Sequence, residues 1–387
     1  MARRRLRRAL LALAPVAVGA TAACSSGSGE EAARTAVTAE SRAEAGAAGP
    51  SARAAAPTSW RGFGAGRWPG PTWRPYAPSS PFNRPIPRGT PTHPRSAEMI
   101  ATVLSRGGPS PMQVGVAQTR DDWGHPTYYA KSTDPVFRLQ STAGWGRNPI
   151  DGHRIPIPVA ARPAGGGDGH MTVVTPDGWE YDFWQVQDKP AGGGTLRFSW
   201  GGRLRIDGDG LRGGGTASRF GNIAGMIRAQ ELAAGRIRHA LFVVIRCAGV
   251  GDWFGHGVQA RGQSAFVYPA ISGGARCPAG TIAPPMGARL QLAMSRAEIA
   301  ALPVPAWKKT ILRALARYGG YIGDTGGDGI NFMFESSTMY TSFGVPDPLV
   351  SFARANGVRQ SGDRYVFDIA PGVDWARYLR VVPPPRR

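Results

Sequence analysis

The chain has 387 residues, of which 54 are Gly, 34 are Pro and only 19% are charged. So much Gly and Pro argues against a helical bundle or a coiled coil and favours turns and short strands, while an aromatic content of 9% is too high for a disordered chain. No apolar run of about 18 residues occurs beyond the N-terminus, which excludes a multi-pass membrane protein.

The charge is strongly basic, with a formal net value of +20, and only four of the 46 basic residues are Lys. Arg guanidinium groups suit carboxylates and phosphates better than ammonium groups do. The candidate partners are therefore nucleic acid, an anionic glycan or an anionic lipid surface. The predicted cellular location discriminates among them.

The N-terminus predicts export. Basic residues crowd the first eight positions, an apolar stretch covers 9–20, and small residues precede Cys24. Residues 1–23 therefore read as a secretory signal peptide, by the Sec or the twin-arginine route, and Cys24 as the lipidated residue of a bacterial lipoprotein. An ordinary signal peptide cut nearby is the alternative. A lipid-anchored, extracytoplasmic protein meets polysaccharide or cell-wall polymer rather than nucleic acid.

Cysteine usage agrees with export. Once Cys24 is lipidated, Cys247 and Cys277 remain as an even pair in an oxidising compartment. We expect a disulfide between them.

Composition divides the rest of the chain into three parts. Residues 24–58 hold no aromatic side chain and predict a disordered tether. Residues 59–165 form a Pro- and Trp-rich extended strap with loops, whose aromatics either stack on glycan or pack on the body. A short helix is expected over 96–104, with Ser96 as its N-cap. Residues 166–387 are the predicted body.

The body reads mainly as strands. Hairpins are expected over 170–186 and 195–206, the second turning at Gly201-Gly202. Further strands and helices are expected in chain order: a helix at 223–234, strands at 237–246, 264–269 and 288–293, a helix at 305–318 after a capping box that begins at Ser295, a strand at 329–335, a helix at 348–355 and a last strand at 364–369. The fold class is therefore mainly β, an antiparallel, jelly-roll-like β-sandwich decorated with a few α-helices, and we expect a monomer.

The most informative chemistry lies on the first hairpin. Glu180 and Asp182 are two residues apart on a predicted strand and share one face. Two carboxyl groups on one face suit a glycoside hydrolase, which needs an acid and a nucleophile or base. The spacing is similar to the ExDxxE pattern of laminarinase-type sandwich glycosidases, although Gln185 stands where the last Glu belongs. A solvent-facing charged pair is the alternative.

Other candidate residues surround this pair. His170 and His239 begin predicted strands and suit proton transfer, although each could equally be structural. Arg289 could bind substrate beside the same cleft, or be a solvated strand-start residue. Tyr321 and Asp324 lie on a Gly-rich turn that follows the 305–318 helix and suits a site loop or a plain helix cap. Trp184 is a further candidate substrate contact.

An ordered set of short motifs links these candidates: HM at 170–171, EYD at 180–182, RHAL at 238–241, PMGAR at 285–289 and YGxYxxD at 318–324. In this set the chain resembles a group of secreted bacterial proteins that is frequent in actinobacteria and soil bacteria. The resemblance covers about 160–340. It implies a shared extracellular domain, with no assigned activity.

Three functions follow as hypotheses for this exported protein. A polysaccharide lyase would use Arg289 or His239 to neutralise a uronate and Tyr321 or His170 as the base, a glycoside hydrolase would use Glu180 and Asp182, and a non-catalytic lipoprotein would bind glycan or support the envelope. No metal is expected, with calcium at the Gly-rich loop 207–215 as a weak alternative. We expect His170, Asp182, His239 and Arg289 to converge on one cleft.

Overall fold

The computed structural model describes residues 62–64, 67–105, 107–115, 122–251, 254, 258–259 and 262–385. The predicted signal peptide, the tether and Cys24 lie outside these residues. No helix in the described part of the chain has both the length and the apolar character that a membrane crossing requires.

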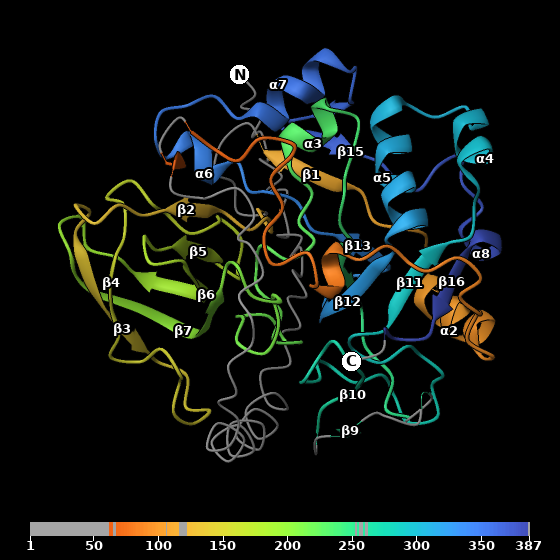
Figure 1. Cartoon of the computed structure of the whole chain (residues 1–387), viewed down its shortest axis with the longest axis horizontal. Coiled ribbons are helices and arrows are strands. Elements are labelled where there is room, and N and C mark those ends of the chain that lie inside the picture. Colours follow the sequence, from red (N-terminus) through yellow and green to blue (C-terminus); the bar gives the residue numbers. More distant parts are fainter. Residues whose placement is uncertain are drawn as a thin grey trace, which may run out of the picture.

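Two large sheets lie side by side (Figure 1). The first has six strands in the order β2-β5-β6-β7-β3-β4. Its strands are β2 (Thr127–Tyr129), β3 (Val136–Ser141), β4 (Arg154–Pro156), β5 (Met171–Val174), β6 (Trp179–Asp188) and β7 (Gly194–Arg205). Residues 127–156, from the predicted strap, therefore share a sheet with the predicted body.

The second large sheet has five strands in the order β13-β8-β12-β11-β16. They are β8 (Leu241–Ile245), β11 (Arg289–Leu292), β12 (Gly320–Thr325), β13 (Ile330–Phe332) and β16 (Leu379–Val382). Two small sheets complete the strands, with the orders β1-β15-β14 and β10-β9. They contain β1 (Met112–Gly115), β9 (Val258–Gln259), β10 (Ala265–Phe266), β14 (Gln360–Ser361) and β15 (Arg364–Phe367).

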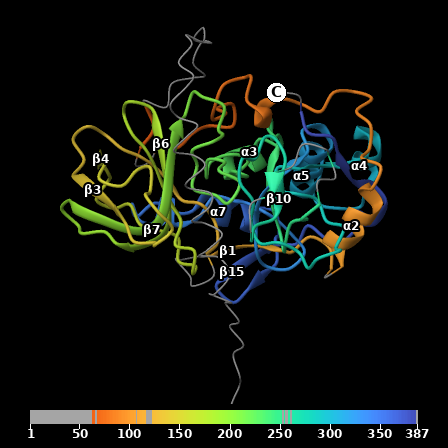
Figure 2. The ribbon, with the colours of Figure 1, turned by 90° about the horizontal axis from the view of Figure 1, so that it is seen from below.

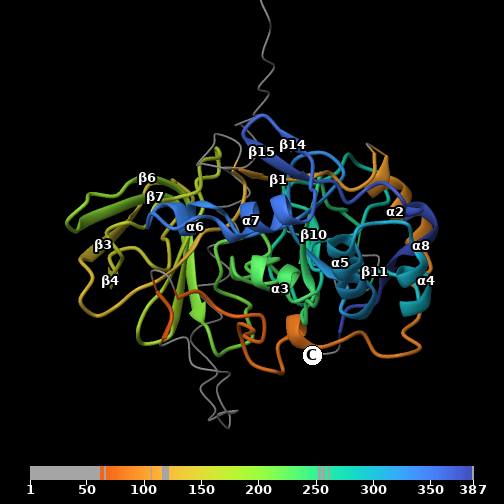
Figure 3. The same ribbon diagram turned by 90° about the horizontal axis from the view of Figure 1, so that it is seen from above.

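Short helices surround the five-stranded sheet and the junction between the sheets (Figures 2 and 3). They are the 3-10 helix η2 (Pro81–Asn83) and the α-helices α2 (Ser96–Leu104), α3 (Ala229–Ala233), α4 (Arg296–Ala301), α5 (Ala306–Arg317), α6 (Thr338–Thr341), α7 (Pro348–Ala355) and α8 (Trp375–Tyr378). Helix α5 packs on β11 and helix α2 on β16, so they cover the sheet on the side away from the six-stranded sheet.

The expectation of a mainly β protein, sandwich-like and decorated with a few helices, is confirmed. Most strand pairs are antiparallel, as expected from the hairpins. Three pairs are parallel, namely β2 with β5, β3 with β7 and β8 with β12, so both large sheets are mixed.

Several local predictions are also confirmed. The hairpin of β5 and β6 pairs Val174 with Glu180 and Thr172 with Asp182. Helices α2, α5 and α7 lie within a residue of their predicted bounds. The predicted N-cap of α2 is wrong, because Ser96 is already in the helix and its hydroxyl accepts the Val381 N–H instead. The capping box before α4 forms because the Ser295 hydroxyl accepts the Glu298 N–H and the Glu298 carboxylate accepts the Ser295 N–H.

The predicted turn at Gly201-Gly202 is wrong, because β7 runs straight through it as one strand. These glycines allow close approach of backbone rather than a turn. A Cβ on Gly201 would lie 2.5 Å from the Asp182 carbonyl oxygen, and one on Gly202 would lie 2.0 Å from the Gly213 carbonyl oxygen. The loop that contains Gly213 therefore packs directly on the sheet.

Other predicted elements also differ. The helix predicted over 223–234 is limited to α3, and the Gly-rich turn predicted after α5 is the strand β12. Regular structure continues beyond the predicted last strand, since α8 and β16 follow and β16 pairs with β11. Pairing with distant strands stabilises β12 and β16, and local sequence carries no signal of those partners.

Two hydrophobic cores flank the six-stranded sheet. Tyr181 and Phe183 on β6 point into the smaller core, whereas Glu180 and Asp182 point to the opposite face, toward the loop at 210–223. The larger core continues to the five-stranded sheet and its helices. The strap residue Trp73 is buried in it, so this aromatic packs on the body rather than stacking on glycan.

The predicted disulfide between Cys247 and Cys277 is confirmed. The two residues are 30 positions apart and lie beside the paired bridge of Ala248 and Arg276. Closing a loop of this size contributes roughly 2–4 kcal/mol to the free energy of unfolding in the chain-entropy view.

Candidate active site

A cavity of about 1220 Å³ opens between the two large sheets. Strands β8, β12 and β13 of the five-stranded sheet supply one wall, including Phe242, Asp324 and Asn331. Strands β6 and β7 supply another, through Trp184 and Trp200. Its volume is large enough for a ligand of several rings, and its lining mixes aromatic side chains with a few convergent polar groups, as ligand sites do.

Three tryptophans form what we call the tryptophan wall: Trp145, Trp184 and Trp200. The ring of Trp145 stacks on that of Trp184 at a centroid distance of 5.6 Å and an interplanar angle of 23°, and it lies 5.7 Å from the ring of Trp200. Trp184 and Trp200 are directly opposite each other on neighbouring strands, whereas Trp145 comes from the loop after β3. Sheet pairing thus fixes two of the rings, and the third packs on both.

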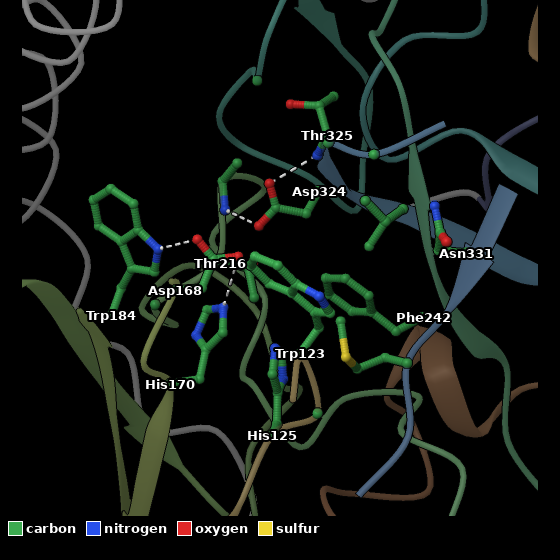
Figure 4. A pocket seen from close by; sticks show the side chains of 18 of the residues that line it. Trp123, His125, Asp168, His170, Trp184, Thr216, Phe242, Asp324, Thr325 and Asn331 are labelled. Carbon is green, nitrogen blue, oxygen red and sulfur yellow. Dashed lines mark hydrogen bonds and ion pairs between the residues drawn. The ribbon is translucent and has the colours of Figure 1, made fainter. Parts of the chain in front are cut away.

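Asp168 lies at the edge of this wall. Its carboxylate accepts a hydrogen bond from the Trp184 indole Nε1–H at 3.0 Å, and it lies 3.8 Å from His170 Nε2 (Figure 4). Its side chain is 45% exposed, so the carboxylate is held in place yet open to the cavity. Asp168 belongs to the Gly-rich segment 165–169, whose backbone turns sharply before β5.

Two histidines lie beneath Asp168. The rings of His125 and His170 are 4.3 Å apart, and His125 Nδ1 lies 2.9 Å from the Asn222 carbonyl oxygen. Burial lowers the pKa of His170 to about 4, and burial together with His170 lowers the pKa of His125 to about 3. Both imidazoles are therefore neutral at pH 7, so the Asp168–His170 contact joins a carboxylate to an uncharged ring.

Asp324 supplies the second accessible carboxyl group. It accepts hydrogen bonds from the Thr325 N–H at 2.7 Å and the Ala217 N–H at 3.2 Å (Figure 4). Burial raises its pKa to about 6, and the negative charge of Asp168 adds to the rise. Near neutral pH this group therefore exchanges a proton readily, and it faces a second carboxyl group that influences it.

Two further acids in the lining, Asp122 and Glu335, form hydrogen bonds that hold neighbouring segments together. Asp122 accepts hydrogen bonds from the hydroxyls of Ser336 and Thr338, and burial raises its pKa. Glu335 accepts the Tyr340 hydroxyl at 2.9 Å and is buried, which raises its pKa to about 7. The bonds to Asp122 join its loop to the start of α6, and the bond to Glu335 joins α6 to the residue that precedes Ser336.

Glu180 and Asp182, the predicted catalytic pair, do share a strand face, but neither lines the cavity. Both are 0% exposed. Asp182 accepts hydrogen bonds from the Thr172 hydroxyl and from the N–H groups of Gly215 and Asn222, at 2.9–3.1 Å. It therefore attaches the loop at 215–222 to the sheet.

Glu180 accepts the Tyr76 hydroxyl at 2.7 Å and the Ile223 N–H at 3.2 Å. Burial and the neighbouring Asp182 raise its pKa well above the usual range, and burial raises that of Asp182 to about 6. The pair is thus a buried structural anchor rather than the solvent-facing pair considered as the alternative.

Three other predicted residues are also buried away from the cavity. His239 lies between the Ala240 carbonyl at 2.9 Å and Glu231, beside the buried Arg228–Glu231 ion pair. Arg289 donates to the carbonyl oxygens of Tyr318 and Arg84, and its guanidinium lies 4.9 Å from the ring centre of Tyr321. Tyr321 is 0% exposed, and burial raises its pKa to about 12.

The predicted convergence of His170, Asp182, His239 and Arg289 on one cleft is therefore not what the structure shows. Of these four, only His170 lines the cavity. Trp184 and Asp324, predicted as substrate contacts, line it too. The strand starts that carry His239 and Arg289 are covered by η2 and the segment around Arg84, which fills the rim where a cleft was expected.

Several lining residues escaped the sequence analysis. Asp168 had a usable signal, since it lies in a Gly-rich loop two residues before His170. His125 and Trp145 had none, because they come from separate segments that reach the cavity only through the parallel pairing of β2 with β5 and of β3 with β7. Trp200 is opposite Trp184 in the antiparallel pairing of β6 with β7, next to the turn that was wrongly predicted at Gly201-Gly202.

The described residues contain no group of three or more His, Cys, Asp or Glu side chains arranged to hold a metal ion. In the Gly-rich loop considered for calcium, Asp207 pairs with Arg205 at 2.9 Å and Asp209 accepts the Leu211 N–H. These acids therefore already have protein partners.

Comparison with known proteins adds no relative to this geometry: no protein-family model, no curated protein and no solved structure matches the chain.

Proposed function

We propose that this protein is a glycoside hydrolase that cleaves a polysaccharide in the tryptophan-lined cavity. One observation carries the proposal: a held, accessible carboxylate and a carboxyl group with a raised pKa both face a cavity walled by stacked indoles. Glycoside hydrolysis needs two carboxyl groups with different protonation states at one bond.

The two carboxyl groups take different roles. Asp324, with its pKa near 6, is the proton donor to the glycosidic oxygen as the bond from the anomeric carbon to that oxygen breaks. Asp168 acts on the opposite side, either by taking a proton from the attacking water or by bonding to the anomeric carbon before water replaces it. In both cases one water molecule is consumed and one new reducing end forms.

The neutral histidines position Asp168 rather than transfer protons. With pKa values near 3 and 4, His125 and His170 have no proton to donate at neutral pH beyond the one on the uncharged ring. His170 lies beside the Asp168 carboxylate and Trp184 donates to it, so the carboxylate is aimed before substrate arrives.

The tryptophan wall favours sugars over other substrates. The C–H-rich faces of sugar rings pack against the electron-rich faces of indoles. Three indoles line the cavity, so a sugar chain in it contacts more than one ring, which suits an internal segment of a polymer.

The same placement of residues disfavours a lyase. The lyase hypothesis assigned uronate neutralisation to Arg289 or His239 and proton removal to Tyr321 or His170. Of these, only His170 lines the cavity. Non-catalytic glycan binding remains the second candidate, and the tryptophan wall alone supports it.

The location of the reaction follows from the N-terminal pattern. The predicted signal peptide over 1–23 and Cys24 support an extracytoplasmic, lipid-anchored enzyme that acts on cell-wall or extracellular glycan.

Product analysis tests the proposal. The purified protein is incubated with a panel of neutral and acidic polysaccharides, and reducing ends and ultraviolet absorbance are both followed. New reducing ends without new absorbance support a hydrolase. Absorbance from an unsaturated uronate would instead identify a lyase, and retention of a polysaccharide without any product would identify a binding protein.

A further inference from the structure

The exposed part of the six-stranded sheet carries three arginines that the proposed hydrolysis does not use. Arg138, Arg154 and Arg197 come from the adjacent strands β3, β4 and β7 and are all exposed. We call them the arginine face. Arg138 is directly opposite Arg154 in the strand register, and such like-charge neighbours repel each other.

These arginines lack acidic partners within the part of the chain that the structure describes. None of the three forms an ion pair there, although Asp188 lies opposite Arg197 in the register. Elsewhere on the protein, the partly exposed Arg95 and Arg205 do pair with neighbouring carboxylates. Three exposed arginines beside one register neighbour of opposite charge, Asp188, leave a net positive surface, which suits an anionic ligand.

The arginine face lies on the same side of the sheet as the tryptophan wall. Leu196 and Phe198 point into the smaller core, so Arg197 between them points the other way, as Trp184 does beside the buried Phe183.

Polar side chains connect the two surfaces. The Gln187 amide donates to the hydroxyls of Thr142 at 2.9 Å and Ser199 at 3.1 Å, and the Ser199 hydroxyl donates to Gln185 Oε1 at 2.8 Å. Gln185 is the residue after Trp184. These hydrogen bonds therefore form a polar network on β6, β7 and the residue after β3, adjacent to Trp184 of the cavity wall.

We propose that the arginine face binds the carboxylates of an acidic polysaccharide whose neighbouring, uncharged sugars occupy the cavity. This inference rests on the proposed function and assigns its substrate class. Arg138 and Arg154 are directly opposite each other on strands about 4.8 Å apart, whereas Arg197 is opposite Gln140, two residues along β3 from Arg138. The three cations therefore form a cluster on neighbouring strands that several carboxylates of one sugar chain can reach. Guanidinium groups also bind carboxylates through bidentate hydrogen bonds. The cavity lining contains four acids, Asp122, Asp168, Asp324 and Glu335, against two arginines, Arg219 and Arg364, so the acidic sugars fit better on the arginine face outside it.

The test compares charged and uncharged forms of the same polymers. The full-length protein is titrated with carboxymethyl-cellulose against hydroxyethyl-cellulose, and with carboxymethyl-dextran against dextran. The variant carries Arg138→Gln, Arg154→Gln and Arg197→Gln together. A matched control carries Arg236→Gln, Arg296→Gln and Arg359→Gln, which removes the same charge from exposed arginines elsewhere.

We expect the unchanged protein to prefer the carboxymethyl form of at least one pair. The arginine-face variant should lose about tenfold in affinity for that form and keep its affinity for the uncharged form within about twofold, since each exposed charge contact contributes modestly. The control triple should keep the preference, and the preference should weaken as salt is added.

Equal or absent binding of both forms by the unchanged protein overturns the inference. An equal loss in the control triple also overturns it, because net charge alone would then explain the preference. Vesicles with and without phosphatidylglycerol form a further arm: loss of vesicle binding with an unchanged carboxymethyl preference would reassign the surface to lipid. Cleavage is scored separately, so a protein that keeps the preference but releases no reducing ends contradicts only the proposed hydrolase.

Discussion

Two pairs of carboxyl groups lie on opposite sides of one loop, and they differ in what surrounds them. Asp182 and Glu180 are buried and accept five hydrogen bonds from the loop, the strap and the neighbouring strand. Asp168 and Asp324 line the cavity, and each accepts its bonds from the wall behind it. The acids have similar chemistry, but only the second pair can meet a substrate.

The difference shows what strand spacing can and cannot establish. Two acids separated by one residue share a face in any strand, and this held for Glu180 and Asp182. Whether that face is open depends on the loop that packs on it. Here Gly202 and Gly213 let that loop approach the sheet too closely for a ligand to enter.

The sharpest way to test the comparison is to neutralise one acid of each pair. Asp324→Asn should lower the rate of polysaccharide cleavage by about 10²–10⁴-fold, because the proton donor is lost. The midpoint of chemical unfolding should change little. Asp168→Asn should behave in the same way. Rates of reducing-end release and unfolding curves, measured on the same preparations, check both. An Asp324→Asn protein with full activity would contradict the assignment.

Asp182→Ala should have the reverse effect. The Thr172 hydroxyl and the N–H groups of Gly215 and Asn222 would lose their shared acceptor inside the protein, which costs about 3 kcal/mol or more of unfolding free energy. Denaturant titration measures this loss. Cleavage per folded molecule should fall far less than in Asp324→Asn. If Asp182→Ala is instead stable and inactive, the buried pair belongs to the chemistry and the comparison fails.

The sequence was sufficient to predict the fold class, the disulfide and the helices α2, α5 and α7, because these depend on composition, cysteine count and local periodicity. It reached part of the site as well, through His170, Trp184 and Asp324. It did not predict the cavity, because Trp145 and His125 join it only through parallel pairing between distant strands, and because a turn was predicted beside Trp200 where β7 continues. The prediction for β12 was also wrong, because its Gly-rich sequence is typical of a turn although it forms a central strand.

The pH dependence of cleavage should separate the two roles within the cavity pair. Asp324 must carry its proton to act, and its pKa is near 6, so the rate should fall as pH rises through about 6, approaching tenfold per pH unit. The residual activity of Asp324→Asn should lack this fall. A rate that stays constant from pH 5 to 8 would show that the raised pKa is not used. Stability is recorded at each pH, so that unfolding is not mistaken for titration.

The smallest expected effect concerns the wall rather than the acids. Trp145→Ala should weaken polysaccharide binding about tenfold, which corresponds to about 1.4 kcal/mol, because one face of the stacked pair is removed while Asp168 and Asp324 keep their hydrogen bonds. The matched control is Trp179→Ala on the same strand as Trp184. Trp179 lies under the Arg203 guanidinium and does not line the cavity, so its loss should leave binding unchanged. Both tryptophan variants are made in an Asp324→Asn background, so that no turnover occurs, and titration calorimetry with the best substrate measures their affinities. Equal losses of affinity in the two variants would show that Trp145 acts through general stability. The proposal that the sugar chain binds in the cavity would then be contradicted.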